Sequence, residues 1–235
     1  MKKLAVITGG TKGIGRATIE RFAKEGFDII TCARNHKDIE QLIEDINERF
    51  PSIEIHAVQA DLSNKNEVAR FAEVVKSLDR PVDMLLNNTG TFIPGSVHNE
   101  EDGNLEMMIE TNLYSAYHLT RALISGMMER KSGHVFTTGS IAGIQAYANG
   151  GSYSISKFAL LGFTKALREE MKPHGVRVTS ILAGATYTSS WEGVELPVER
   201  FMKAEDIADA IYAAHALSPN TVVEEIILRP QLGDI

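Results

Sequence analysis

The sequence contains very little cysteine. Cys32 is the single cysteine among 235 residues, so no disulfide can form within the chain and the fold must rely on its packed core. Proteins of oxidising compartments often carry paired cysteines, whereas a lone thiol fits a reducing environment. We therefore expect a cytoplasmic location.

Long apolar runs are absent as well. The chain begins MKKLAVITGG, and its first apolar stretch is far shorter than a signal sequence or a membrane span and ends in glycines. We interpret this stretch as the first strand of the fold and expect no membrane partner.

Clustered positive charge is also lacking. With 24 Lys and Arg against 31 Asp and Glu, the formal net charge is −7, and no basic block stands out. A nucleic-acid partner is therefore not expected. The seven histidines form neither H-x-H nor H-E-x-x-H, so no metal site is predicted.

What the sequence does contain is an alternation of short β-branched runs with longer amphipathic segments. Strands are predicted at 4–8, 28–33, 53–60, 84–88, 134–139, 177–182 and 224–229. Helices are predicted at 14–25, 37–49, 64–78, 101–130, 152–172 and 204–217. Gly26 suits the end of the first helix, and the residues 61–63 suit the start of the third. This order predicts an α/β fold, a single-domain doubly wound parallel sheet of six to seven strands flanked by helices. The length suits one domain over residues 1–235.

A glycine-rich turn, TGGTKGIG at residues 8–15, joins the first predicted strand to the first helix. Glycines let the backbone approach a pyrophosphate, and a helix N-terminus offers N–H donors to it. The spacing is G-x3-G-x-G, which is weak as a bare pattern, but its position favours a dinucleotide site over an unliganded turn.

The end of the second predicted strand indicates which dinucleotide binds. An acidic residue at this end would hold the ribose of NAD, but the sequence reads CARN at 32–35, and Asp28 lies at the opposite end. Arg34 together with Lys12 suits a 2′-phosphate. We therefore predict NADP(H), with two solvated surface cations as the alternative.

Tyr153 and Lys157 lie four residues apart within a predicted helix, so both side chains share one face. An ammonium beside a phenol lowers the phenol pKa and makes proton transfer near neutral pH feasible. Taken alone, the pair is more often a surface lysine beside a half-buried tyrosine.

With these motifs in hand, the chain resembles the short-chain dehydrogenase/reductase family along its whole length, as a single NADP-binding Rossmann-type domain. Further motifs carry the likeness: ADL at 60–62, NNTG at 87–90, TNL at 111–113, TGS at 138–140 and AGATYT at 183–188. The resemblance implies a carbonyl reductase that works by hydride transfer on a small substrate.

The resemblance also implies site residues. The implied catalytic residues are Asn112, Ser140, Tyr153 and Lys157. The implied cofactor-binding residues are Gly9, Thr11, Lys12, Gly13, Ile14, Gly15, Arg34, Asp61, Leu62, Asn88, Gly90, Tyr153, Lys157, Gly184, Thr186 and Thr188. Ser140 would hold the substrate carbonyl, Tyr153 would donate the proton, Lys157 would lower the Tyr153 pKa, and Asn112 would hold a water.

Two positions depart from the family pattern. Thr89 replaces the usual alanine and adds a hydroxyl near the cofactor path, and Ala183 replaces the usual proline and removes a backbone restraint. We expect more mobility after the sixth strand and a less secure position for Thr188.

The substrate loop is predicted at about 188–203, with Trp191, Val194, Leu196 and Phe201 as apolar contacts. This loop and the C-terminal stretch are similar to sepiapterin-reductase-like members, in which a carboxylate near the C-terminus anchors the substrate. Asp234 is the candidate here.

Other readings remain open. A 3-oxoacyl-[acyl-carrier-protein] reductase is the main alternative, although Lys131 and His174 stand where such enzymes usually carry arginines. A non-catalytic NADP-binding sensor is disfavoured because the Ser, Tyr and Lys are all present, and an epimerase because no residues remain for a second domain. The resemblance also implies a dimer or tetramer formed through helices 101–130 and 152–172.

Overall fold

The computed structural model describes residues 2–188 and 195–235. Within these residues seven strands form one sheet in the order β3-β2-β1-β4-β5-β6-β7, and every pairing is parallel. The strands are β1 Leu4–Thr8, β2 Asp28–Ala33, β3 Ile55–Gln59, β4 Val82–Asn87, β5 Gly133–Thr138, β6 Val176–Ala183 and β7 Glu225–Leu228. The predicted doubly wound parallel sheet is therefore confirmed.

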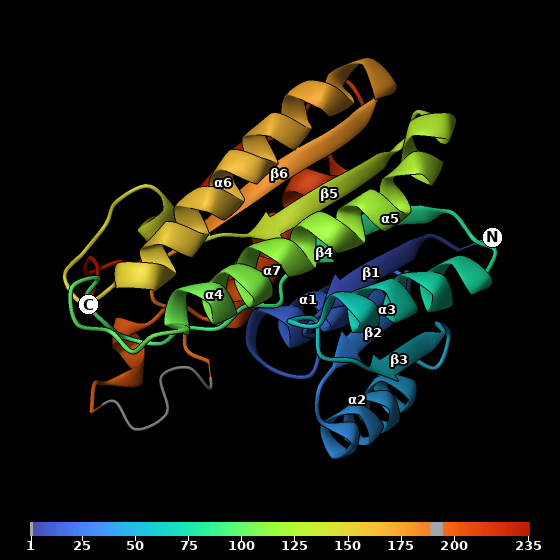
Figure 1. The fold of residues 1–235 in the computed structure, drawn as a ribbon. Helices are drawn as coiled ribbons and strands as arrows, with labels where there is room; N and C mark the ends of the chain where they lie inside the picture. The colour runs from blue at the N-terminus through green and yellow to red at the C-terminus, as the bar shows by residue number, and fades with distance from the viewer. Residues whose placement is uncertain (1, 189–194) are drawn as a thin grey trace.

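Helices cover both faces of this sheet (Figure 1). They are α1 Gly13–Lys24, α2 His36–Arg49, α3 Lys65–Ser77, α4 Asn104–Ile109, α5 Ser115–Arg130, α6 Gly151–Met171 and α7 Ala204–Ala216. One apolar cluster packs α3, α5 and α6 against one face, and a second packs α1, α2 and α7 against the other. The single described domain therefore has three layers, helix–sheet–helix.

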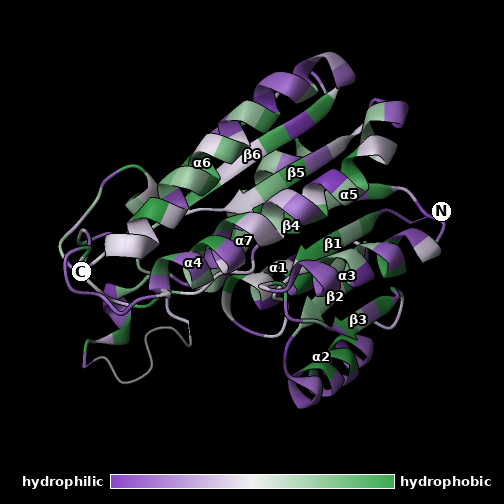
Figure 2. Cartoon of the chain, viewed as in Figure 1, coloured by the Kyte–Doolittle hydropathy of each residue, from purple (hydrophilic) through white to green (hydrophobic). Residues whose placement is uncertain are grey.

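The central strands are nearly continuous apolar runs because both of their faces are covered. All five residues of β1 are buried, and Figure 2 shows hydrophobic strands between helices of mixed polarity. The helices show polar residues outward and apolar residues toward the sheet, as their spacing predicts. Burial on two faces explains why the sequence pattern located these strands well.

One predicted helix is wrong as a continuous element. Residues 101–130 form α4, a π-helical turn at Glu110–Tyr114 and then α5. A π turn inserts an extra residue into the helix and redirects the side chains around it. Asn112 lies in this turn and is buried, so the interruption falls at a predicted catalytic position.

Two helix ends can be checked against their expected capping. Gly26 follows α1 with φ +81°, the left-handed conformation expected there, and its N–H bonds to the Ala23 carbonyl. The start of α3 differs: Asn64 is the N-cap and accepts from the Asn66 N–H, whereas Asp61 holds a turn through Ser63. This shift frees Asp61 from the helix cap.

The loops that carry most of the predicted site residues gather at the carboxyl ends of the strands, the edge at which doubly wound sheets bind ligands (Figure 1). In the described ranges, no helix is both long and apolar enough to cross a membrane.

Candidate active site

The glycine-rich turn between β1 and α1 is built so closely that side chains are excluded from it. Gly9 and Gly13 adopt φ +65° and +54°, which favour glycine. A Cβ at Gly15 would lie 2.3 Å from the Gly9 carbonyl oxygen. Lys12 is the N-cap residue of α1, and its side chain makes no capping hydrogen bond to the first N–H groups of this helix. Such a turn is a cradle for an anionic group.

Asn88 ties the ends of three strands together beside this turn. Its amide nitrogen donates to the Thr8 carbonyl at 3.0 Å, and its amide oxygen accepts from the Thr138 hydroxyl at 3.1 Å. The Thr8 hydroxyl accepts in turn from the N–H groups of Asn88 and Thr89 at 2.8 and 3.0 Å. Asn88 therefore contributes by holding the strand ends that give the cradle its shape.

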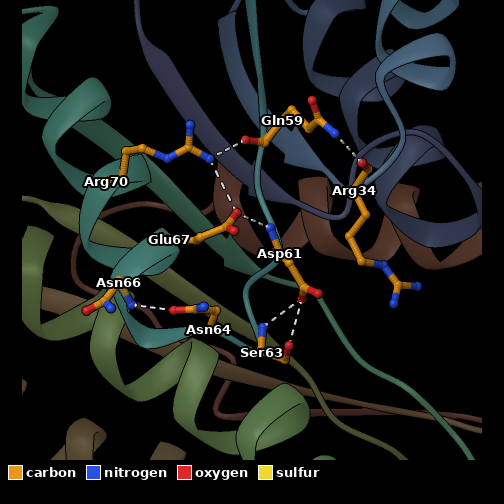
Figure 3. Close-up of polar contacts among 8 residues, drawn as sticks. All are labelled: Arg34, Gln59, Asp61, Ser63, Asn64, Asn66, Glu67 and Arg70. Atoms are coloured by element: carbon orange, nitrogen blue, oxygen red, sulfur yellow. Dashed lines mark hydrogen bonds and ion pairs between the residues drawn. The ribbon is translucent and has the colours of Figure 1, made fainter.

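Polar contacts around β3 and the start of α3 hold Asp61 in place (Figure 3). Its Oδ1 accepts from the N–H and hydroxyl of Ser63 at 3.0 and 2.8 Å, and its own N–H donates to Glu67 at 2.8 Å. Leu62 is 3% exposed and belongs to the core, so only its backbone is open to a ligand. Thr11 and Ile14 are half-buried.

Arg34 is exposed at the carboxyl end of β2. Its carbonyl accepts from Gln59 at 3.0 Å, while its guanidinium points away from this network and forms no ion pair with any described residue (Figure 3). Lys12 instead pairs with Asp38 at 3.2 Å. The Asp38 carboxylate therefore lies close to the predicted phosphate site. The residues at the end of β2 alone did not indicate this carboxylate.

Asp28 lies far from this site. It starts β2, is 4% exposed, and its carboxylate pairs with Arg80 at 2.7 Å. Its place at the amino end of the strand agrees with the sequence, so Asp28 cannot take the role of a ribose-binding acid.

Ser140 and Tyr153 meet at the carboxyl end of β5. Ser140 is 8% exposed, its hydroxyl accepts from the Ala142 N–H at 3.1 Å, and it lies close enough to the Tyr153 phenol to act on the pKa of that phenol. Tyr153 is half-buried in the first turn of α6, and its ring meets the Phe92 ring edge to face at a centroid distance of 4.9 Å. The serine hydroxyl and the phenol therefore lie close together.

Lys157 lies one turn further along α6 and is buried. Its Nζ donates to the Thr138 carbonyl at 3.0 Å and lies 5.6 Å from the centre of the Tyr153 ring. A Cβ at Gly90 would come 3.5 Å from this Nζ and 3.3 Å from the Asn112 Oδ1. Glycine at position 90 therefore leaves the space between Lys157 and Asn112 open.

The predicted pKa shift of Tyr153 is wrong for this structure. Burial raises the pKa of Tyr153 to about 12, with the Ser140 hydrogen bond acting in the opposite direction. Burial also lowers the pKa of Lys157 to about 8. The ammonium is thus itself desolvated and donates to Thr138 rather than to the phenol, so its field does not offset the burial of Tyr153.

Asn112 is fully engaged by protein groups. Its amide nitrogen donates to the Thr91 carbonyl at 3.0 Å and to the Ser156 hydroxyl at 2.9 Å, and its oxygen accepts from the Thr91 N–H at 2.7 Å. The side chain therefore holds the segment after β4 against α6. The predicted role of binding a water through this side chain does not fit these contacts.

The segment after β6 returns to the glycine turn. The Gly184 N–H donates to the Leu228 carbonyl at 2.8 Å, and the buried Thr186 bridges to Met202. A Cβ at Gly13 would lie 2.9 Å from the Thr188 methyl. Thr188 therefore lies next to the cradle, and its role in binding the cofactor stays a prediction.

The structure describes only part of the predicted substrate loop. Trp191 and Val194 lie outside the described residues. Leu196 is 40% exposed, but Phe201 is 8% exposed and packs against Tyr187 at 5.7 Å. Phe201 is therefore a core residue rather than the predicted substrate contact. Asp234 forms an ion pair with Arg229.

Sequence reasoning missed two neighbours of the catalytic candidates. Phe92 is 41% exposed beside Tyr153, and Ser156 binds the Asn112 side chain. An apolar aromatic residue directly after NNTGT at a strand end could have indicated Phe92. Nothing in the sequence singles out Ser156, because its role depends on the helix that carries Asn112.

The chain is similar to known proteins along its length. The family model described as short chain dehydrogenase matches residues 3–197. A protein named sepiapterin reductase from Chlorobaculum tepidum is 33% identical over 249 aligned residues, covering 100% of this chain and 99% of its own length.

Solved structures are similar as well. An alcohol dehydrogenase from the archaeon Thermococcus sibiricus, complexed with 5-hydroxy-NADP, has a TM-score of 0.91 and 25% identity, covering 98% of this chain and 97% of that one. An L-sorbose reductase from Gluconobacter frateurii, complexed with NADPH and L-sorbose, has a TM-score of 0.88 and 26% identity, covering 97% and 95%.

Proposed function

The chain belongs to the short-chain dehydrogenase family, and we propose that it is an NADPH-dependent reductase that converts a ketone or aldehyde of a small substrate to an alcohol. In this proposal residues 1–235 act as one cofactor-binding domain, with its substrate loop at about 188–203. The observation that carries it is that the Ser140 side chain and the Lys157 ammonium both lie close to Tyr153, at the carboxyl ends of the strands.

The residues present fit a dinucleotide. The cradle of Gly9, Gly13 and Gly15 has no room for side chains, which suits backbone contact with a pyrophosphate. The Arg34 guanidinium, which forms no ion pair with any residue that the structure describes, suits a 2′-phosphate, and the structural relatives bound to NADP or NADPH support NADP(H) as the cofactor. When bound, the nicotinamide supplies the hydride.

Residues of the chain itself supply the proton that the substrate oxygen takes up. Ser140 orients the substrate oxygen by a hydrogen bond, and Tyr153 donates its proton to that oxygen as negative charge develops there. Lys157 holds a positive charge behind the phenol, and Asn112 fixes the segment at Thr91 against α6 through two hydrogen bonds to Thr91 and one to Ser156. A phenol with a pKa of about 12 is fully protonated at neutral pH, which suits a proton donor.

The substrate proposed is a small carbonyl compound of the sepiapterin type. The support is the 33% identity to a protein named sepiapterin reductase, which extends over the whole chain. The exposed Phe92 ring beside Tyr153 also suits a flat substrate. The Asp234 carboxylate is balanced by Arg229, so a substrate that binds there must displace this ion pair.

The test is NADPH consumption by purified protein. The substrates are sepiapterin, a diketone, an aldehyde and an acetoacetyl thioester, with Tyr153→Phe as the blank. We expect turnover of sepiapterin or the diketone, little turnover of the thioester, and a loss of about 100-fold or more in the blank. Dominant thioester activity would instead favour a 3-oxoacyl-carrier reductase.

We also propose self-association as a dimer or tetramer. Large apolar side chains are exposed along α4, the π turn and α6: Leu105, Met107, Tyr114, Ile155 and Phe158. Monomeric proteins rarely expose so many on adjoining elements. Light scattering at micromolar concentration should give at least twice the chain mass of 25.8 kDa, and a monomer would contradict the proposal.

A further inference from the structure

Tyr153 is the third residue of α6, so its position depends on the first turn of that helix. The N-cap residue, Gly150, offers no side-chain cap. The first N–H groups of a helix have no partner within the helix and need one from elsewhere. The way this turn is held therefore bears directly on where the phenol lies.

Glu100 supplies that missing cap from a distant segment. Its carboxylate accepts from the Ser152 hydroxyl at 2.5 Å and from the Ser152 N–H at 3.3 Å. Ser152 is 1% exposed and immediately precedes Tyr153. A carboxylate at a helix N-terminus is favoured both by these hydrogen bonds and by the helix dipole.

The backbone around Glu100 is fastened to the same turn. The Gly151 N–H donates to the Gly95 carbonyl at 2.9 Å, and the Gly95 N–H donates to the Asn149 carbonyl at 3.0 Å. A Cβ at Gly151 would lie 2.8 Å from the Gly95 oxygen, and one at Gly95 would lie 2.8 Å from the Glu100 Cβ. The backbone at Gly95 and Gly151 is therefore packed so closely that segment 95–100 has little room to run differently past the start of α6.

The same segment also touches the catalytic candidates. Phe92 packs edge to face on the Tyr153 ring at 4.9 Å, and the backbone of Thr91 is held on both sides by Asn112. Segment 91–100 thus contacts the phenol, the turn that carries it, and the asparagine behind it.

We propose that Glu100 is a positioning residue for Tyr153, its carboxylate holding the first turn of α6 so that the phenol faces Ser140. This inference rests on the proposed function, in which Tyr153 donates the proton. In this role Glu100 acts through the first turn of α6 and not on the substrate itself.

The test compares Glu100→Ala with Glu100→Gln and with Glu101→Ala. Glu101 is exposed, and its carboxylate forms no hydrogen bond or ion pair with a described residue, which makes it a matched control. Glu100→Ala is expected to lower kcat about tenfold while KM for NADPH stays unchanged, since a small misplacement of a reacting group is costly. Glu100→Gln should restore most of kcat because its amide oxygen can still accept from Ser152.

A double-mutant cycle with Ser152→Ala tests the contact itself. Ser152→Ala alone removes the shorter hydrogen bond and should lower kcat several-fold, and it remains informative if Glu100→Ala does not fold. Adding it to Glu100→Ala should cost little more, because the two residues act as one unit. Fully additive losses would overturn the proposal.

A measurement without substrate separates this inference from the proposed function. The ring signals of Tyr153, assigned by their loss in Tyr153→Phe, report the nearby Phe92 ring in the NMR spectrum. They should shift in Glu100→Ala and stay in place in Glu101→Ala. Unchanged signals and unchanged kcat would overturn the role of Glu100. A wild type without carbonyl turnover would overturn the proposed function, while the shift would still support Glu100.

Discussion

Tyr153 and Lys157 lie one helical turn apart, and burial acts on them in opposite directions. The phenol pKa rises to about 12, and the ammonium pKa falls to about 8. Both shifts favour the neutral form, because a charged group loses hydration when it is buried. At neutral pH the phenol keeps its proton and the ammonium keeps most of its charge. This combination suits the proposed reduction, in which the phenol gives up its proton as an alkoxide forms.

Arg34 is the single residue that we expect to determine the preference for NADPH over NADH. Its guanidinium forms no ion pair with any described residue and points away from the contacts drawn in Figure 3, so it is free to bind a phosphate. Arg34→Ala should weaken NADPH binding by about 10- to 100-fold, the usual worth of a hydrogen bond to a charged group. NADH binding should stay unchanged, because NADH lacks the 2′-phosphate.

The control for this prediction is Lys37→Ala, which removes an exposed positive charge from the first turn of α2. Titration of cofactor fluorescence gives both affinities. Equal losses for NADPH and NADH in Arg34→Ala, or equal losses in both variants, would show that general charge rather than Arg34 governs the preference.

Residue types at the site could be predicted from the sequence, but their partners could not. Ser140, Tyr153 and Lys157 stand in recognisable motifs, and the structure brings them together. The contacts of Glu100 and Asp38 cross between elements far apart in the chain. Such contacts depend on tertiary packing, which local periodicity does not encode.

At the scale of elements, the buried strands were predictable and the helix near Asn112 was not. β1 and β2 match their predicted ranges because both faces of each strand are covered. The break at Glu110–Tyr114 has no Gly or Pro to announce it. There, hydrogen bonds from the buried Asn112 side chain to other segments outweigh regular helix geometry.

The turn that opens α1 gives a prediction about an element. Gly15→Ala would place a Cβ 2.3 Å from the Gly9 carbonyl oxygen, which is backbone and cannot move aside easily. The cradle must therefore distort, and NADPH binding should fall at least tenfold. The free energy of unfolding should fall by about 1–3 kcal/mol, as for other overpacked sites.

Gly126→Ala in α5 is the matched control, since its added methyl would meet only the end of the Arg130 side chain, 3.4 Å away. Alanine is the better helix former, so this variant should gain about 0.5–1 kcal/mol of stability. Urea unfolding and cofactor titration measure both effects. Normal NADPH binding by Gly15→Ala would contradict the assignment of this turn.

At the scale of the whole molecule, the two ends of the sheet serve different purposes. The carboxyl ends of the strands carry the candidate active site. Near the opposite end, His134 at the start of β5 stacks on His215 of α7 at 5.6 Å, within a cluster that includes Phe22 and Phe27. The Nδ1 atoms of both histidines are buried and have no hydrogen-bond partner among residues 2–188 and 195–235. Both rings therefore have to stay neutral in the fold.

This histidine pair predicts how stability depends on pH. Burial, with Arg177 and Lys3 nearby, lowers the pKa of His215 to about 4, and burial also lowers that of His134 well below its usual value. In the unfolded chain a histidine binds a proton near pH 6.5. Between these values the unfolded state holds more protons, so stability is present above about pH 6.5 and is lost as the pH falls toward 4.

His215 alone should remove about 2 kcal/mol of unfolding free energy between pH 7.5 and pH 5. Urea unfolding at the two pH values measures this difference. His215→Phe keeps an aromatic ring in the cluster but cannot bind a proton, so its pH dependence should be flatter by about that amount. His98→Gln, which changes an exposed histidine, should keep the wild-type dependence. If His215→Phe also kept it, the acid sensitivity would have to arise from groups outside this cluster.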